Sequence, residues 1–206
     1  MVFDFDGTLA RQTLDFAVMR REAVTAMSAF VVVPDRPELP TMELLALVGL
    51  ATEAAREANR AARNAIRRVE VEAAAGSALF PFVRPMLTSL KARGLGMAVV
   101  TRNCSEAVRT VFPDIDRHSL LFTRDDVDRV KPHPEHLCRA LAALGVAAEH
   151  TVMIGDHPMD IVVGKRAGTL TGGVATGEHS LEALRSHEPD FLAPDGEGLM
   201  RDLGIL

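Results

Sequence analysis

Short apolar runs and amphipathic segments of helical period alternate along most of this chain. The apolar runs, each long enough for a short strand, lie at residues 2–5, 95–100, 120–122, 151–154, 172–177 and 190–193. Between them, apolar residues recur every three or four positions, as on one face of a helix, in residues 86–92, 105–112, 135–144, 160–168, 181–185 and 198–203. This alternation predicts a parallel sheet with right-handed crossovers, a Rossmann-like α/β core flanked by helices.

One long segment, residues 14–77, interrupts the alternation because it contains helical patterns and no convincing strand. Helices are expected over about residues 12–28, 41–49 and 52–75. Thr41 is a plausible N-cap for the second of them, and three prolines exclude a helix in the stretch before it. We therefore expect two domains, an α/β core made of residues 1–13 and 78–206 and a small all-helical insertion made of residues 14–77.

The third helix of the insertion carries four arginines at spacings of four, three and four residues, which place them on one helix face. We call them the arginine stripe: Arg56, Arg60, Arg63 and Arg67. One interpretation is an anion-attracting surface over an active site. The interpretation we favour is a solvated face paired with the glutamates of the same helix, because most charged helix faces are of this kind.

Composition narrows the class of protein. The chain has 206 residues, 48% of them apolar, which is enough for one ordinary core and a small insertion. A net charge of −5 argues against a nucleic-acid partner, and no run of eighteen apolar residues suggests a membrane span. The first strand begins at once and leaves no room for a signal peptide, so we expect a cytoplasmic protein that acts on small molecules. The sequence leaves the oligomeric state open.

The cysteines and two neighbouring histidines show no pattern of a metal or redox site. Cys104 and Cys138 are far apart in the sequence, and we expect both to be buried free thiols. His133 and His136 have no further Cys or His partner nearby. We therefore interpret these histidines as surface or capping residues.

Polar residues follow the predicted strands and form the candidate site. Asp4 and Asp6 follow the first strand, just before Gly7 and Thr8. The second strand runs into Thr101, Arg102 and Asn103, and the fourth ends in Gly155, Asp156 and, four residues later, Asp160. Because α/β proteins bind ligands at the carboxyl ends of parallel strands, we expect these residues to meet at one edge of the sheet.

Lys131 is singled out by how rare lysine is in this chain. Only three of the 23 basic residues are lysines, and this one stands between the third strand and a long helix, directly before a proline. A compact ammonium group suits a single-point contact with a phosphate oxygen. Lys131 is therefore a candidate phosphate ligand.

Taken in order, these groups resemble the four motifs of the haloacid dehalogenase-like (HAD) hydrolases. The stretch from Asp4 to Thr8 is similar to the Asp-x-Asp-x-Thr of the phosphatase branches of that superfamily. Thr101 resembles its second motif, Lys131 its third, and the stretch from Gly155 to Asp160 its fourth, Gly-Asp-x-x-x-Asp. The resemblance extends over nearly the whole chain. The helical insertion resembles the cap domain that many of these hydrolases carry just after the first motif.

This resemblance implies a Mg²⁺-dependent phosphatase that works through an aspartyl-phosphate. Asp4 would attack phosphorus, while Asp6 would protonate the leaving alcohol and then activate water. The substrate phosphate would be held by Thr101, Arg102, Asn103 and Lys131. Magnesium would be bound by Asp4, the backbone carbonyl of Asp6, and Asp156, with Thr8, Gly155 and Asp160 supporting them.

The implied substrate is a small phosphorylated metabolite, with phosphoglycolate as one candidate. Arg11 and Gln12 replace the Asp-Ser often found at this place in phosphoglycolate phosphatase-like members, which leaves the particular substrate open. A β-phosphoglucomutase-like sugar phosphomutase would keep all four motifs. A haloacid dehalogenase would lack Asp6, and a non-catalytic HAD-fold binding protein would be expected to have a broken motif set. We therefore favour the phosphatase.

Overall fold

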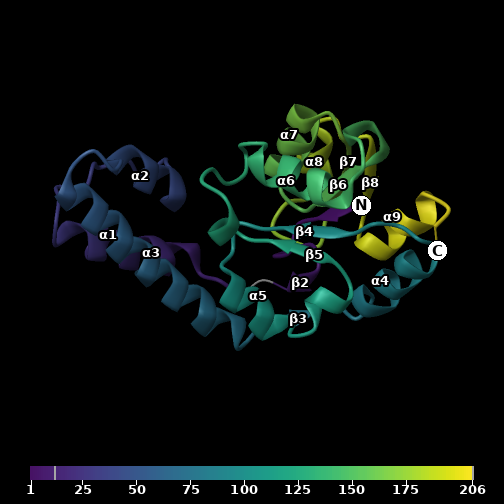
Figure 1. The fold of residues 1–206 in the computed structure, drawn as a ribbon, viewed down its shortest axis with the longest axis horizontal. Coiled ribbons are helices and arrows are strands. Elements are labelled where there is room, and N and C mark those ends of the chain that lie inside the picture. The colour runs from purple at the N-terminus through teal and green to yellow at the C-terminus, as the bar shows by residue number, and fades with distance from the viewer. Residues whose placement is uncertain (12, 206) are drawn as a thin grey trace. The chain divides into compact units, whose positions relative to one another are not determined.

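The computed structural model describes residues 1–11 and 13–205, and its centre is a six-stranded parallel sheet (Figure 1). The strand order is β5-β4-β1-β6-β7-β8. The strands are β1 (Val2–Phe3), β4 (Ala98–Val100), β5 (Leu120–Phe122), β6 (Val152–Gly155), β7 (Leu170–Val174) and β8 (Phe191–Ala193). Strand β1 lies between β4 and β6 and is parallel to both. The predicted Rossmann-like sheet is confirmed.

Helices follow the strands and cover both faces of this sheet. They are α4 (Val83–Ala92), α5 (Ser105–Val111), α6 (Glu135–Leu144), α7 (Pro158–Ala167), α8 (Leu181–Arg185) and α9 (Gly196–Asp202). Short 3₁₀ helices are η1 (Ile115–Arg117), η2 (Arg124–Asp126) and η3 (Ala148–His150). Phe3 packs in a core with residues of α4, α5 and α9, whereas its neighbour Val2 packs with residues of α6 and α7. Burial on both faces explains why the strands are apolar throughout.

Residues Thr13–Gly76 form a compact unit of their own, separate from the unit that contains the sheet. Its helices are α1 (Phe16–Ser28), α2 (Thr41–Val48) and α3 (Glu53–Ala74). Met27, Leu44 and Ile66 belong to its apolar core. The Asn59 side chain donates to the carbonyl of Gly49 at 2.7 Å, which satisfies a carbonyl just beyond the end of α2. The assignment of this unit as a cap domain stays a prediction.

The arginine stripe lies on the exposed side of α3, and all four of its arginines are exposed. Arg60 pairs with Glu57 on the same helix, and Arg56 donates to the carbonyl of Leu50 at 3.1 Å. Glu70, by contrast, is buried. The prediction that Glu70 lies on the solvated face with Glu53 and Glu57 is therefore wrong.

A small antiparallel pair of strands was not predicted. Strand β2 (Ala10–Arg11) precedes the helical unit in the sequence and β3 (Ala78–Leu79) follows it, and Ala10 pairs with Leu79. Two residues per strand are too few for a periodic pattern to be recognised, and only the pairing itself identifies them. These strands join the segments that lead out of the sheet-containing unit and back into it.

Several element boundaries differ from those predicted. Thr41 is the first residue of α2, and Pro40 occupies the N-cap position. The sequence also offers Asn103 or Ser105 as the N-cap of the helix over residues 105–112, but the N-cap of α5 is Cys104. Helix α4 begins three residues before Met86, because Pro85 falls in the first turn, where its missing N–H is not needed. Gln12, where the first helix was predicted to begin, lies outside the described residues.

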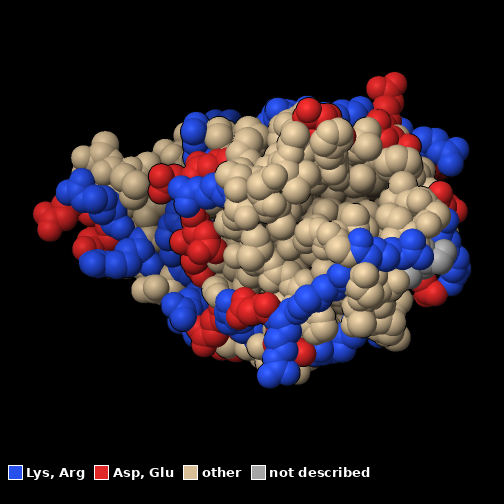
Figure 2. All heavy atoms as spheres, turned by 45° about the vertical axis from the view of Figure 1, so that its right-hand side comes forward, with Lys and Arg blue, Asp and Glu red and all other residues tan. Residues whose placement is uncertain are grey.

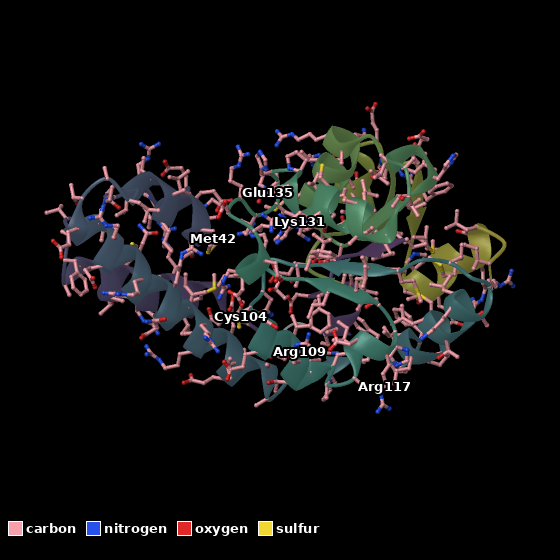
Figure 3. The ribbon with its side chains drawn as sticks, in the orientation of Figure 1. Met42, Cys104, Arg109, Arg117, Lys131 and Glu135 are labelled. Carbon is pink, nitrogen blue, oxygen red and sulfur yellow. The ribbon has the colours of Figure 1, made fainter. Side chains whose placement is uncertain are left out.

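Two burial predictions are also wrong. Cys104, at the start of α5 (Figure 3), is buried as predicted, but Cys138 is exposed. His136 is fully buried, with its Nε2 atom 2.7 Å from the carbonyl oxygen of Thr123. The histidine therefore links α6 to the segment after β5 and is not a surface residue.

The surface carries both acidic and basic side chains, as expected for a sequence with 28 acidic and 23 basic residues. On the face shown in Figure 2, acidic and basic side chains lie close together around a broad uncharged area. Among the described residues, no helix is both long enough and apolar enough to cross a bilayer.

Candidate active site

Three neighbouring strands deliver the candidate residues to one edge of the sheet. Asp4 follows β1, Thr101 follows β4, and Asp156 follows β6. Since β1 pairs in parallel with both neighbours, these three strands end on the same side. The backbone N–H of Asp4 donates to the carbonyl of Ile154 at 2.8 Å, so the hydrogen bonding of the sheet continues up to the site.

Lys131 is the positive centre of the site. Its Nζ atom lies 2.8 Å from Asp4 Oδ1 and 2.7 Å from Asp160 Oδ1. Only 2% of the lysine side chain is exposed. Burial opposes the charge on the ammonium group, but the carboxylates of Asp160 and Asp4 outweigh it and raise the pKa of Lys131 to about 12. Lys131 is therefore a charged cation held between two acids.

Asp156 is the second buried acid of the site, with 6% of the residue exposed. The hydroxyl of Thr8 donates to its Oδ1 atom at 2.8 Å. Burial, followed by the charges of Asp4 and Asp160, raises the pKa of Asp156 to about 8. Without a further cation, this carboxyl group therefore holds a proton at neutral pH.

Asp160 lies in the first turn of α7 and is 1% exposed. Its Oδ1 atom accepts from Lys131, and its Oδ2 atom accepts from the backbone N–H of His157 at 3.2 Å. Burial, followed by the charge of Asp4, raises the pKa of Asp160, and the ammonium group of Lys131 opposes that rise. Gly155 makes room for this carboxylate, because a Cβ atom at that position would lie 2.1 Å from Asp160 Oδ2. Glycine is therefore required at residue 155.

The acids are arranged as a site for a hard divalent cation. Asp4, Asp156 and Asp160 each offer a carboxylate oxygen, and these oxygens lie within 4.8 Å of one another. Carboxylate oxygens are the ligands that Mg²⁺ prefers, and three acids exceed the single charge of Lys131. The residues thus fit a magnesium ion. Because both oxygens of Asp160 already accept hydrogen bonds, Asp4 and Asp156 are the better ligands.

Asp6 lies outside that group of three acids and contacts the loop after β4 instead. Its carboxylate accepts from Asn103 Nδ2 at 3.1 Å and from the hydroxyl of Thr101 at 3.4 Å. Gly7, with a φ of 77°, forms the turn directly after it. Asp4 and Asp6 therefore have different neighbours: Asp4 pairs with the buried Lys131, and Thr101 and Asn103 are among the donors to Asp6.

The remaining predicted phosphate ligand, Arg102, is held beside the fourth motif. Its guanidinium donates to the sulfur of Met159 at 3.2 Å, in the first turn of α7. Its backbone carbonyl accepts from the guanidinium of Arg124 at 3.2 Å. Arg124 is buried at 4% exposure, and its backbone N–H also donates to the carbonyl of Asn103. Sequence analysis missed Arg124, because a basic residue in a loop carries no signal of burial.

A second feature missed by the sequence analysis is the loop after β7. The hydroxyl of Thr176 donates to the carbonyl of Gly7 at 2.6 Å, and Gly177 lies directly against Asp156. A glycine soon after a buried strand was the available signal, but nothing in the sequence shows which carboxylate it faces.

Comparison with known proteins assigns the family. The profile of the haloacid dehalogenase-like hydrolases matches residues 1–174, so this chain belongs to that family. Among curated proteins, it is 45% identical over 85 residues to the pyrophosphatase PpaX of Anoxybacillus flavithermus, covering 41% of this chain and 40% of that protein. It is 33% identical over 133 residues to the phosphoglycolate phosphatase of Salmonella typhimurium, covering 63% and 53%. The chain thus spans about half the length of the curated relatives it matches.

Solved structures show the same fold at low sequence identity. A hydrolase from Pseudomonas syringae has a TM-score of 0.74 at 19% identity, with 98% of this chain and 96% of that chain covered. CbbY from Rhodobacter sphaeroides, solved in complex with phosphate, has a TM-score of 0.65 at 21% identity, covering 96% and 97%. The resemblance of the sequence to the HAD hydrolases is confirmed.

Proposed function

We propose that this chain is a Mg²⁺-dependent phosphomonoester hydrolase with Asp4 as its nucleophile. The observation that carries the proposal is the contact of Asp4 Oδ1 with Lys131 Nζ at 2.8 Å, in a buried setting shared with Asp156 and Asp160. Phosphoryl transfer brings an anionic nucleophile to an anionic group, so a site needs positive charge and fixed positioning more than covalent chemistry. The ammonium group of Lys131 would supply the positive charge, and its contact with Asp4 would fix the position of the nucleophile.

The first half of the proposed reaction transfers the phosphoryl group to the enzyme. A carboxylate oxygen of Asp4 attacks phosphorus, the bond from phosphorus to the alcohol oxygen breaks, and Asp6 gives its proton to the departing oxygen. The environments of the two acids support separate roles. Asp4 lies 2.8 Å from the buried ammonium group of Lys131, which positions it as the nucleophile, whereas Asp6 accepts from Thr101 and Asn103 in the loop after β4.

The second half releases phosphate. Asp6, now ionised, takes a proton from water, whose oxygen attacks phosphorus, and the bond to Asp4 breaks to give inorganic phosphate and the free carboxylate. In both halves we assign the phosphoryl oxygens to Thr101, Arg102, Asn103 and Lys131. The hydroxyl of Thr101 can turn from Asp6 to a phosphoryl oxygen at little cost, because its contact with Asp6 is long, at 3.4 Å. The amide of Asn103 donates to Asp6 at 3.1 Å and would exchange this hydrogen bond for one to a phosphoryl oxygen.

We assign the magnesium ligands to Asp4, the backbone carbonyl of Asp6, and Asp156. Bound there, Mg²⁺ would supply positive charge to the phosphoryl oxygens as charge builds on them. Thr8, Gly155 and Asp160 would orient the ligands: Thr8 donates to Asp156, Gly155 makes room for Asp160, and Asp160 fixes Lys131.

The substrate class we propose is a small phosphorylated metabolite. Relatives named as a phosphoglycolate phosphatase and a pyrophosphatase support phosphate esters or anhydrides of low mass. We assign the helical unit, Thr13–Gly76, as a cap that selects among them.

The direct test is a panel of phosphomonoesters and pyrophosphate, incubated with purified protein and Mg²⁺ while free phosphate is measured. The panel should include phosphoglycolate. We expect release from at least one small ester, and none in excess chelator. Equal release in chelator would contradict the metal dependence, and no release from the Asp4→Asn variant is the required control.

A further inference from the structure

The loop after β7 contacts two of the loops that carry the proposed site, although it contains none of the four motifs. We call residues 175–180 the β7 loop. Three of its residues, Thr176, Gly177 and His179, contact the segments that hold the first and fourth motifs. The loop is therefore placed to affect the geometry of the acids without touching the reacting atoms.

Gly177 lies so close to the carboxylate of Asp156 that a side chain at residue 177 would displace this carboxylate. A Cβ atom built on Gly177 would lie 1.8 Å from Asp156 Oδ2 and 2.6 Å from Cγ. A Cβ atom on Gly7 would lie 2.3 Å from the same Oδ2 atom. Both glycines therefore leave space that this carboxylate occupies, while the hydroxyl of Thr8 donates to its Oδ1 atom at 2.8 Å.

The consequence of adding a methyl group differs between the two glycines. Gly7 has a φ of 77°, so a side chain there strains the backbone as well. Gly177 is not among the residues with positive φ, so alanine fits its backbone conformation. The most movable neighbour is the end of the Asp156 side chain. Alanine at residue 177 should therefore turn that carboxylate away and leave the fold intact.

Two further contacts fix the position of the β7 loop. The hydroxyl of Thr176 donates to the carbonyl of Gly7 at 2.6 Å, which links the loop to the first motif. The ring of His179 packs edge-on against the ring of His157, with centroids 4.5 Å apart and an interplanar angle of 87°. His157 directly follows Asp156 and also accepts from the N–H of Met159 at 3.0 Å. The β7 loop thus contacts both Gly7, which lies against the Asp156 carboxylate, and His157, which follows Asp156 in the sequence.

We propose that Thr176 and Gly177 are positioning residues that set the orientation of the Asp156 carboxylate for cation binding. Gly177 does so by leaving space, and Thr176 by holding Gly7 and the β7 loop together. The inference rests on the proposed function, because it takes Asp156 as a magnesium ligand. Groups behind metal ligands commonly change metal affinity by about 10- to 100-fold when they are altered.

The test is Mg²⁺ binding by the full chain, measured by isothermal titration calorimetry without substrate. We expect Gly177→Ala and Thr176→Val each to weaken Mg²⁺ binding by about 10-fold or more. Thr176→Ser keeps the hydroxyl group and should bind as wild type does. Glu178→Ala is the matched control, since Glu178 is an exposed residue of the same loop. Circular dichroism of each variant reports whether the fold is retained.

The outcomes separate this inference from the proposed function. Unchanged affinity in Gly177→Ala, with Asp156→Asn clearly weakened, overturns the positioning role and leaves the metal site in place. No Mg²⁺ binding by wild type, or wild-type binding by Asp156→Asn, overturns the proposed metal site itself. If Gly177→Ala fails to fold, the Thr176 pair decides: weak binding by Thr176→Val with normal binding by Thr176→Ser supports the proposal, and equal binding by both contradicts it.

Discussion

The ammonium nitrogen of Lys131 lies 2.8 Å from Asp4 Oδ1, where only 2% of the lysine side chain is exposed. A buried ion pair adds little to stability compared with apolar packing, but removing one partner leaves a charge without compensation. Removal of Lys131 would leave two buried carboxylates without their cation, because Asp160 lies 2.7 Å from the same ammonium group. Lys131 should therefore affect the stability of the protein as well as the proposed catalysis, and the two effects can be measured separately.

Lys131→Met should lower both activity and stability. We expect turnover to fall by at least about 100-fold, because a charged donor to the phosphoryl group is lost. In chelator, the free energy of unfolding should fall by about 3–5 kcal/mol, because Asp4 and Asp160 lose their cation. Phosphate release and urea denaturation measure the two effects. Lys165→Met is the matched control: this exposed lysine pairs with Glu188 at 3.9 Å, and its loss should cost about 1 kcal/mol or less.

Asp4→Asn should abolish turnover while the protein still folds. The two side chains have nearly the same shape, so packing is kept, but an amide cannot serve as the nucleophile. We expect turnover to fall by at least about 1,000-fold, with a circular dichroism spectrum like that of wild type. Substantial turnover by this variant would assign the nucleophile to another residue.

The sequence predicted which residues would meet at the sheet edge, because each of them is identified by the apolar run directly before it. Asp4, Thr101 and Asp156 each follow an apolar run, and parallel strands must bring their carboxyl ends together. The surroundings of Asp6 could not be predicted in the same way. Its contacts with Thr101 and Asn103 depend on how two loops, about 95 residues apart in sequence, turn at the sheet edge. Periodicity describes the strands and says nothing about the loops.

The burial of polar residues was the second feature that could not be predicted from the sequence. Patterns place polar side chains outside by default, so His136 was assigned to the surface although it is fully buried. The buried Arg124 was missed for the same reason, and the contact of Gly177 with Asp156 was missed because it joins segments that are distant in the sequence. In each case the partner is a backbone carbonyl or a carboxylate from another segment, which no single stretch of sequence displays.

Asp6→Asn should slow release of the phosphoryl group from the enzyme. Without a base at this position, water is activated poorly, so the aspartyl-phosphate accumulates. Mass spectrometry of protein quenched during turnover should find a phosphoryl group on Asp4, at higher occupancy than in wild type. The double variant Asp4→Asn, Asp6→Asn is the control and should carry none. A complete lack of label in both wild type and Asp6→Asn, under conditions of proven turnover, would rule against the covalent route.

The pH dependence of stability without metal should reveal Asp156. Burial raises its pKa to about 8 in the folded protein, well above that of an aspartate in an unfolded chain. At Asp156 the folded state therefore binds more protons than the unfolded state between about pH 5 and 8, so this group contributes stability that is lost as pH rises. The raised pKa of Asp160 contributes in the same direction, whereas His157, whose pKa is lowered by burial, contributes in the opposite direction. Urea denaturation in chelator at several pH values should therefore show that wild type loses more stability with rising pH than Asp156→Asn does. Mg²⁺ should raise the stability of wild type most at pH 8, where it replaces the proton. Equal pH dependence in the two proteins would contradict the raised pKa of this acid.

The choice between phosphatase and phosphomutase can be decided from the destination of the phosphoryl group. A mutase must prevent transfer to water until a sugar hydroxyl is in place, and the proposed resemblance links that control to His and Lys residues of the cap and hinge. Residues 11–90 of this chain contain neither histidine nor lysine. Arginine cannot take over an acid–base role, because it stays protonated at any working pH. We therefore expect transfer to water. With β-glucose 1-phosphate and a bisphosphate primer, free phosphate should appear in step with loss of any phosphorylated substrate. Glucose 6-phosphate formed in excess over free phosphate would instead make this chain a mutase.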